Sequence, residues 1–184
     1  ENLVEGQINL RDAARDIKHH TLANLDFYLE EFEARVIEAG GAVHWCRTGA
    51  EARTAILKIC KQAGARTVTK SKSMIGEEIA INEHLEEHGI EPVETDLGEY
   101  IIQLAEETPS HLVAPALHKS KEDVAELFAE KLGIPYDEDI YHMAATARTV
   151  LRDKFMEADL GISGANFVVA ETGTLVIFTN EGNG

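Results

Sequence analysis

Residues 66–99 read RTVTKSKSMIGEEIAINEHLEEHGIEPVETDLGE, a run in which short extended segments alternate with helical ones. The apolar segments at 66–69 and 92–95 predict two strands. A helix that begins at Ser73 separates these strands, and Asp96 is the predicted N-cap of a second helix. Such alternation is typical of a mostly parallel sheet that is flanked by helices.

The same alternation continues on both sides of this run. Before it, we predict a strand at 42–46 and then a helix that begins with a capping box of Thr48 and Glu51 and ends at Gly64. After it, a further strand is predicted at 111–114. Two more helices are predicted in the second half of the chain, at 120–133 and 138–158.

The two ends of the chain have other patterns. Apolar residues at three- and four-residue steps predict helix from 11 to 39, as two helices or as one that is broken near 19–21. Near the other end, short apolar segments occur at 160–163, 166–170 and 174–179. The last two segments are spaced for an antiparallel hairpin.

These patterns predict an α/β fold class, with a Rossmann-like, mostly parallel sheet flanked by helices and a C-terminal β-hairpin. The 184 residues, 44% of them hydrophobic, suffice for one substantial core. We expect residues 1–40 to be a helical segment that packs on the body. Residues 41–184 are expected to form the α/β domain.

The composition limits the classes of partner. The formal net charge of −16 repels nucleic acid backbones and anionic lipid headgroups, so we expect neither as a partner. No apolar run approaches the roughly 20 residues of a membrane-spanning helix, and the first residues lack the pattern of a signal peptide. We therefore expect a cytoplasmic protein. Its two cysteines, Cys46 and Cys60, are too few for a disulfide framework or a metal knuckle.

The first candidate site is the loop that follows the strand at 66–69. In an open α/β sheet, ligands bind beyond the carboxyl ends of the strands. Two lysines and two serines stand there, immediately before a helix start whose free N–H groups favour an anion. We predict an anion site, for a small carboxylate or phosphate, although a solvated turn with a serine cap is the alternative. The candidate residues are Lys70, Ser71, Lys72 and Ser73.

Two further loops offer candidate acids and bases. Glu94, Asp96 and Glu99 lie close together around the end of the strand at 92–95, and the last two are expected to cap the next helix. Glu94 is therefore the freer catalytic candidate. His118 lies in a later loop and is able to act as acid, base or ligand near neutral pH. The alternative is that this histidine is incidental.

The segment from Gly161 to Gly184 is the fourth candidate site. Its glycines allow close approach of a ligand to the backbone, and polar side chains stand at strand ends. Hairpin geometry alone also explains the Thr172–Gly173 pair. Glu171 is the third catalytic candidate, after Glu94 and His118. The candidate binding residues here are Asn166, Thr172, Gly173, Asn180 and Glu181.

A histidine pair raises the question of a metal site. His84 and His88 are four residues apart, share one helix face and are able to begin such a site. The sequence shows no third ligand. Because Glu83, Glu86 and Glu87 surround the pair, an exposed polar face is the preferred interpretation, and we predict no metal.

Four blocks of sequence together carry a family resemblance. They are KSKSMIGEE (70–78), ETDLGEYIIQL (94–104), PSHLVAPALHK (109–119) and GISGANFVVAETG (161–173), which runs on to TNEGN. The blocks resemble the lactate utilization domain, and the resemblance spans essentially the whole chain. It implies a fold similar to the superfamily of ribose-5-phosphate isomerase, glucosamine-6-phosphate deaminase and CoA transferases.

The resemblance also implies a setting for the chain. Full-length members of the family carry a downstream ferredoxin-like segment that binds two 4Fe–4S clusters. They act with two partner proteins as electron carriers in the oxidation of L-lactate to pyruvate. This chain stops before the cluster cysteines, so we expect no cofactor in the chain itself.

Two other functions remain open from the sequence. One is a stand-alone enzyme for a small phosphorylated, CoA-linked or carboxylate substrate, as the fold superfamily permits. The other is a structural docking platform without a ligand of its own. Fold alone does not choose between these alternatives.

Overall fold

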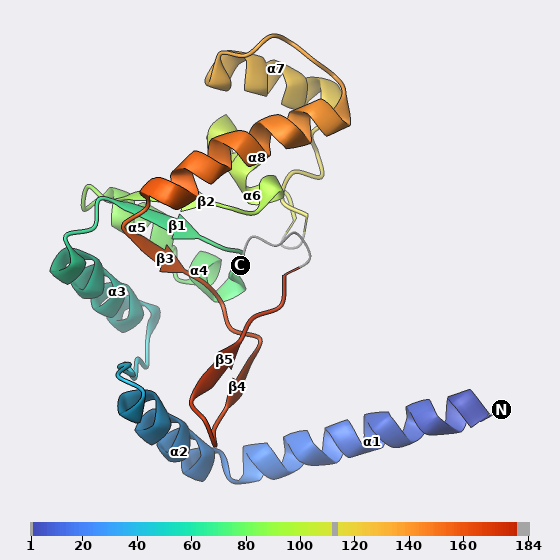
Figure 1. Ribbon diagram of the computed structural model, residues 1–184, viewed down its shortest axis with the longest axis vertical. Helices are drawn as coiled ribbons and strands as arrows, with labels where there is room; N and C mark the ends of the chain where they lie inside the picture. Colours follow the sequence, from blue (N-terminus) through green and yellow to red (C-terminus); the bar gives the residue numbers. More distant parts are fainter. Residues whose placement is uncertain (1, 112–113, 180–184) are drawn as a thin grey trace. The chain divides into compact units, whose positions relative to one another are not determined.

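The computed structural model describes residues 2–111 and 114–179, and the side chains from residue 9 onward (Figure 1). The chain divides into two compact units. The first unit is formed by Glu1–His44 and Ala165–Val176, and the second by Trp45–Gly164 and Ile177–Gly184. No helix within the described residues combines the length and the apolar character that a membrane span requires.

The first unit contains two helices and a hairpin. Helix α1 (Asn2–Ala23) is followed by α2 (Leu25–Glu38), so the break between them lies at Asn24, a few residues beyond the predicted position. Strands β4 (Phe167–Val169) and β5 (Thr174–Val176) pair antiparallel, which confirms the predicted hairpin. The positive φ of 70° at Gly173 suits a residue without a Cβ.

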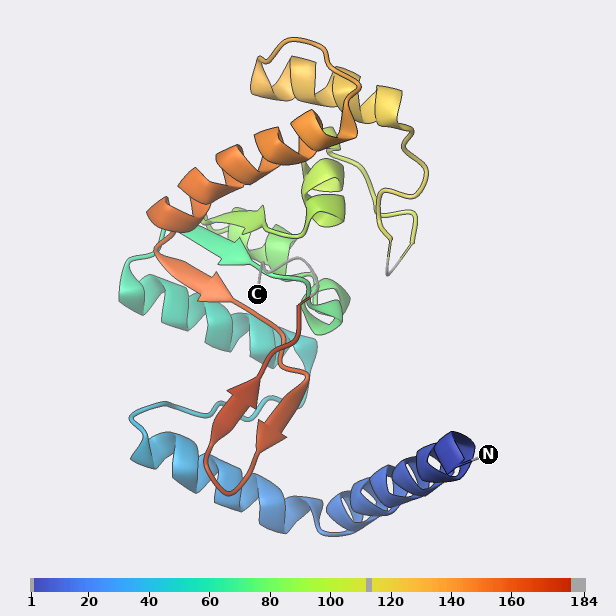
Figure 2. The same ribbon diagram turned by 45° about the vertical axis from the view of Figure 1, so that its right-hand side comes forward.

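The second unit is built on a parallel sheet of three strands in the order β2-β1-β3 (Figures 1 and 2). The strands are β1 (Thr67–Lys70), β2 (Glu91–Glu94) and β3 (Leu160–Ile162). In this register Lys70 is the partner of both Glu94 and Ile162, so all three strands end at the same edge. The mixed α/β fold with a parallel sheet is therefore confirmed.

Helices cover both faces of this sheet (Figure 2). One apolar cluster joins Val68 of β1 to Cys60 and Leu85 from the helices on one face. A second cluster joins Val93 of β2 to the helices on the other face. The first face is covered by α3 (Gly49–Ala63) and α5 (Ile81–Glu86), and the second by α6 (Leu97–Ala105) and α8 (Ile140–Glu157), on which α7 (Lys121–Leu132) packs.

The predicted helix from Ser73 is divided into two short helices. Helix α4 (Met74–Glu78) ends before Ala80, and α5 begins after it. Ala80 has a φ of 50°, a left-handed conformation that costs a non-glycine residue about 1–2 kcal/mol. The break allows Glu77 on α4 and Asn82 on α5 to reach the same end of the sheet.

Helix caps follow the sequence signals closely. The Thr48 side chain accepts from the N–H of Glu51, as predicted, whereas the Glu51 carboxylate accepts from the N–H of Arg47. Ser73 accepts from the N–H of Gly76 and so caps α4. Ser120 forms a complete capping box at the start of α7.

The strand predicted at 42–46 is wrong, and the one predicted at 111–114 lies partly outside the described residues. Residues 42–46 form no strand, and Trp45 is 56% exposed there. His111 and Ala114 are not in a strand either, while residues 112–113 lie outside the described residues. A strand requires a hydrogen-bonded neighbour as well as an apolar run, and the position beside β1 is taken by residues 160–162.

Candidate functional site

Two lysines and four carboxylates meet at the carboxyl end of the parallel sheet. Lys70 and Glu94 are the last residues of β1 and β2, and their register pairing places both side chains on the same face. We call Lys70, Glu77 and Glu94 the inner cluster. The outer cluster consists of Lys72, Asp96 and Glu99, which lie just beyond the strand ends.

The inner cluster is centred on a buried ammonium group. Lys70 is 1% exposed, and its Nζ lies 2.7 Å from Glu77 Oε1 and 2.9 Å from Glu94 Oε1. Glu94 Oε1 also accepts from Asn82 Nδ2 at 2.6 Å. Burial alone would lower the pKa of Lys70, but the two carboxylates raise it above its usual value, so the ammonium group stays charged.

Glu94 is the most strongly enclosed carboxylate of the site. It is 3% exposed, and burial raises its pKa, while Lys70 and Asn82 oppose that rise. Its backbone N–H donates to Gln103 Oε1 at 3.0 Å, which ties the strand end to α6. Removing Lys70 would therefore leave a buried charge without its counter-ion.

The outer cluster is more accessible. The Lys72 side chain is 34% exposed, and its Nζ lies 2.9 Å from Glu99 Oε1 and 3.9 Å from Asp96 Oδ1. Burial and a hydrogen bond with Asp96 raise the pKa of Glu99 to about 7, against the influence of Lys72. The pKa of Asp96 is lowered, because the hydrogen bond from Glu99, Lys72 and backbone N–H groups outweigh its burial.

The opposite pKa shifts of Glu99 and Asp96 correspond to one proton that the two carboxyl groups share. Glu99 holds a proton that it donates to the Asp96 carboxylate, and it loses this proton near neutral pH. A carboxyl group with such a pKa is able to accept or donate a proton at working pH. The outer cluster is therefore the part of the site that is suited to acid–base chemistry.

Some buried side-chain oxygens at this edge have no hydrogen-bond partner within the part of the chain that the structure describes. They are Asn82 Oδ1, Glu94 Oε2 and Glu99 Oε2. Buried polar atoms are normally satisfied, so these oxygens are available to accept a hydrogen bond from a water or a bound molecule. Two of the three belong to carboxylates that contact the two lysines.

The serines of the predicted anion loop hold the backbone of the site. Ser71 Oγ lies 2.7 Å from Ser163 Oγ and so links the end of β1 to the residue after β3. Ser73 caps α4, as expected. The five candidates Lys70, Ser71, Lys72, Ser73 and Glu94 thus come together at one edge, but both ammonium groups contact carboxylates that an incoming anion must compete with. The anion site itself stays a prediction.

The structure places the other candidates elsewhere. His118 Nε2 lies 2.8 Å from Glu107 Oε2 in an exposed loop before α7. Asn166, Glu171, Thr172 and Gly173 belong to the first compact unit. Asn180 and Glu181 lie outside the described residues.

The Thr172–Gly173 pair forms the turn of the β4–β5 hairpin. Thr172 Oγ1 donates to Thr174 Oγ1 at 2.8 Å, and the N–H of Gly173 donates to the carbonyl of Val169 at 2.9 Å. A Cβ added at Gly173 would lie 2.8 Å from the backbone nitrogen of Val36 in α2. The glycine therefore serves close packing of the hairpin on α2 within this unit.

The cysteines do not fit an iron–sulfur cluster. Cys46 is exposed, whereas Cys60 is buried in α3 with 1% exposure. Burial also raises the pKa of the Cys60 thiol, which opposes formation of the thiolate. A 4Fe–4S cluster takes about four cysteine ligands, so this chain cannot provide the set by itself.

Comparison with known proteins identifies the family. The family model described as LUD domain matches residues 29–184, which is well over half of the chain. The chain belongs to the LUD domain family. This confirms the resemblance seen in the four sequence blocks.

Curated relatives of this LUD domain are longer proteins. Lactate utilization protein B of Bacillus cytotoxicus is 49% identical over 173 residues, which cover 94% of this chain and 37% of the relative. The proteins of the same name from Bacillus thuringiensis and Bacillus cereus are 47% identical over the same shares. The chain thus spans little more than a third of the length of these relatives. No solved structure matches this chain.

Two of the resembling blocks supply every charged group of the LUD domain site described above. KSKSMIGEE provides Lys70, Lys72 and Glu77, and ETDLGEYIIQL provides the other three carboxylates, at the end of β2 and just beyond it. Sequence reasoning missed the importance of Glu99, because a capping position already explained it. Its place in the first turn of a helix after a parallel strand was the signal that was available.

Proposed function

We propose that this LUD domain takes part in lactate utilization, as one domain of a longer protein that carries electrons within a complex oxidising L-lactate to pyruvate. The identity of 47–49% to proteins named lactate utilization protein B supports this role. The other two lactate utilization proteins are the proposed partners. The predicted likeness to the ribose-5-phosphate isomerase superfamily stays a prediction.

The outer cluster is the proposed point of contact with the substrate. Oxidation of lactate removes two electrons and two protons, and one of these protons leaves the hydroxyl group. Lys72 is exposed enough to bind the lactate carboxylate through a charge-assisted hydrogen bond. Glu99, with a pKa of about 7, is the proposed acceptor of the hydroxyl proton. The C2–H bond breaks as the carbonyl forms, and its hydrogen leaves with the electron pair of that bond to a two-electron acceptor that the complex would supply.

The observation that carries this proposal is the acid–base state of Glu99 beside an accessible lysine. Glu99 Oε1 contacts Lys72 Nζ, and Glu99 Oε2 has no hydrogen-bond partner within the described residues. The inner cluster has a different part, because a buried Lys70 cannot reach a substrate without opening the fold. It holds the strand ends that position the outer cluster.

Calorimetric titration of the chain with L-lactate, pyruvate and inorganic phosphate tests the binding step. We expect Lys72→Met to weaken lactate binding by about 1.5–3 kcal/mol, the range for a lost charge-assisted hydrogen bond. The matched control is Lys121→Met, which removes an exposed lysine that also contacts two carboxylates. Equal lactate affinity of the Lys72→Met variant and the wild type would exclude this loop from the site.

Growth on L-lactate tests the wider role. The full-length protein that contains this chain is supplied to bacteria that lack their own lactate utilization protein B. We expect Glu99→Gln to slow growth on L-lactate but not on glucose, because the amide cannot accept a proton. Glu122→Gln, on the exposed surface of α7, is the control. Normal growth of the Glu99→Gln strain would contradict the assigned proton acceptor.

A further inference from the structure

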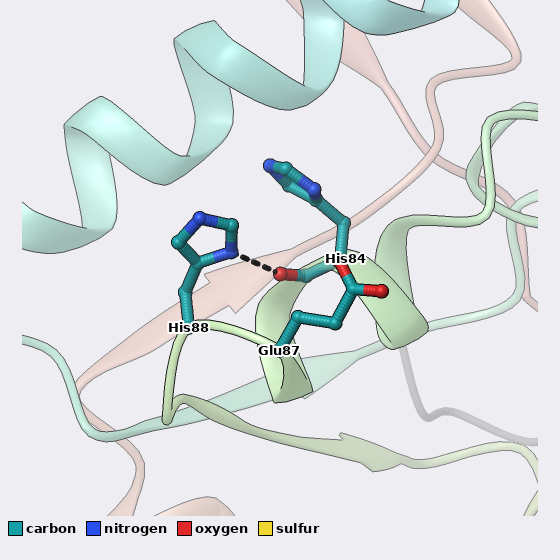
Figure 3. Close-up of side chains that lie close together, drawn as sticks. All are labelled: His84, Glu87 and His88. Atoms are coloured by element: carbon teal, nitrogen blue, oxygen red, sulfur yellow. Dashed lines mark hydrogen bonds between the residues drawn. The ribbon is translucent and has the colours of Figure 1, made fainter.

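Two histidines and a glutamate gather at the C-terminal end of α5. Figure 3 shows the imidazole rings of His84 and His88 on the same side of this helix, with the Glu87 side chain next to them. One possible ligand atom of each residue lies within 4.8 Å of those of the other two. The third ligand that the sequence pattern did not reveal is therefore Glu87.

Helical geometry explains why these residues meet. Residues four apart in a helix lie about one turn apart on the same face, so the two rings lie close, with their centroids 4.6 Å apart and their planes tilted by 54°. Glu87 is exposed in the turn that ends α5. Its side chain has the freedom to move toward the two rings.

The hydrogen bonds of the rings leave lone pairs available. His88 Nδ1 lies 2.8 Å from the backbone carbonyl of His84. A carbonyl only accepts, so Nδ1 of His88 carries the hydrogen and Nε2 carries the lone pair. A backbone carbonyl of this kind commonly orients a metal-binding histidine. His84 Nε2 is buried and has no hydrogen-bond partner within the described residues.

We propose that His84, Glu87 and His88 bind one divalent transition-metal ion. Two imidazole nitrogens and one carboxylate oxygen form a ligand set that suits Zn²⁺ and disfavours Mg²⁺ and Ca²⁺, which take oxygen ligands. Bond lengths of about 2.0–2.2 Å place the ligands of a tetrahedral ion roughly 3.3 Å apart. Side-chain rotation closes the remaining distance. Three protein ligands leave a position for water or another small ligand.

The surrounding charges set limits on the affinity. Glu83 and Glu86 precede the site in the same helix and favour a cation. Arg53 and Lys61 on α3 act on His84 with the opposite sign. The Arg53 guanidinium donates to the carbonyl of Ile79 at 2.7 Å, which fixes its position. The balance favours a moderate affinity rather than that of a structural zinc site.

Calorimetric titration of the chain with Zn²⁺ tests the proposal. We expect one ion per chain, with Mg²⁺ unable to compete at equal concentration. His88→Ala and Glu87→Gln change exposed side chains, so the fold should survive, which circular dichroism checks. Loss of a residue that merely hydrogen-bonds to a metal ligand typically weakens binding about 10–100-fold. His88→Ala removes a ligand itself, so we expect it to weaken Zn²⁺ binding at least as much. Glu87→Gln should weaken it less.

A control separates this site from other surface histidines. His142→Ala removes an exposed histidine that lies 2.9 Å from Asp137, and it should leave the affinity unchanged. Substitution of Co²⁺ should give the visible spectrum of nitrogen and oxygen ligands. Absence of Zn²⁺ binding, unchanged binding by His88→Ala, or a thiolate-to-cobalt charge-transfer band would each overturn the proposal.

Discussion

Lys70 and Lys72 are two residues apart, and each contacts two carboxylates at the same sheet edge, yet their surroundings differ. Lys70 belongs to the last position of β1 and is 1% exposed, whereas the Lys72 side chain lies beyond the strand and is 34% exposed. In the inner cluster, carboxylates on two elements, Glu77 on α4 and Glu94 on β2, hold the ammonium group in its charged form. In the outer cluster, two carboxyl groups share a proton that is lost near neutral pH.

The difference shows that the same kind of group, a lysine between two carboxylates, serves two purposes. A buried cation is retained only with its counter-ions, so the inner cluster acts as part of the framework. A partly exposed cation tolerates the loss of a partner, so the outer cluster is able to change its protonation state and its contacts. Both residues are lysines, so their position relative to the strand end decides which one stabilises the fold and which one is able to take part in acid–base chemistry.

Removal of the buried cation is the largest expected effect. Lys70→Met should lower the free energy of unfolding by about 3–5 kcal/mol at pH 8, because Glu94 is left buried without its counter-ion. Urea denaturation measures the change. The double variant Lys70→Met/Glu94→Gln should recover part of the loss. A loss below about 1 kcal/mol, the value of an exposed ion pair, would contradict the contrast between the clusters.

The pH dependence of stability reports on Glu99. Its pKa is about 7 in the folded chain and has its ordinary value of 4.5 in the unfolded chain. Between these values the folded state holds more protons, so stability falls as pH rises from about 4.5 to 7. Glu99→Gln should remove about 1–3 kcal/mol of this difference between pH 5 and pH 8. Urea denaturation at both pH values measures it, and a slope equal to that of the wild type would refute the assignment.

The smallest expected effect on stability is that of Lys72. Lys72→Met should change the free energy of unfolding by less than about 1 kcal/mol, because the lysine is partly exposed. The same substitution should raise the pKa of Glu99 further, since Lys72 opposes that rise. Carboxyl carbon NMR titration detects this shift, and Lys121→Met is the matched control. A destabilisation as large as that of Lys70→Met would show that the outer cluster also stabilises the fold.

Much of the fold followed from local pattern. Strands β1 and β2 and the hairpin were predictable, because extended runs and turn residues mark them in the sequence. Strand β3 was not recognised as part of the parallel sheet, because it is only three residues long and has a glycine at its centre. The run at 42–46 has strand-like residues but no neighbour to pair with. The pattern of a short segment does not reveal which distant segment it pairs with in a sheet.

The candidate site was predictable in place but not in detail. The rule that ligands bind at carboxyl ends of parallel strands pointed to Lys70, Lys72 and Glu94, and the structure places all three at that edge of the sheet. Lys70 contacts Glu77 on α4, and Asn82 on α5 donates to the Glu94 carboxylate beside it, an arrangement that the helix break at Ala80 allows. The role of Glu99 depends on a pKa that burial and Asp96 produce together. Such properties arise from packing.

The first compact unit is made of two separated segments, and this has a consequence for synthesis on the ribosome. Helices α1 and α2 emerge first, but the hairpin that completes their unit follows about 120 residues later. At 5–20 residues per second this interval is roughly 6–24 s. During it, the parallel sheet is able to form up to β3, while α2 still lacks the hairpin whose Gly173 packs closely on the backbone of Arg35 and Val36. Within this chain, the first unit is thus begun before the second unit and completed after the sheet of the second unit has been made.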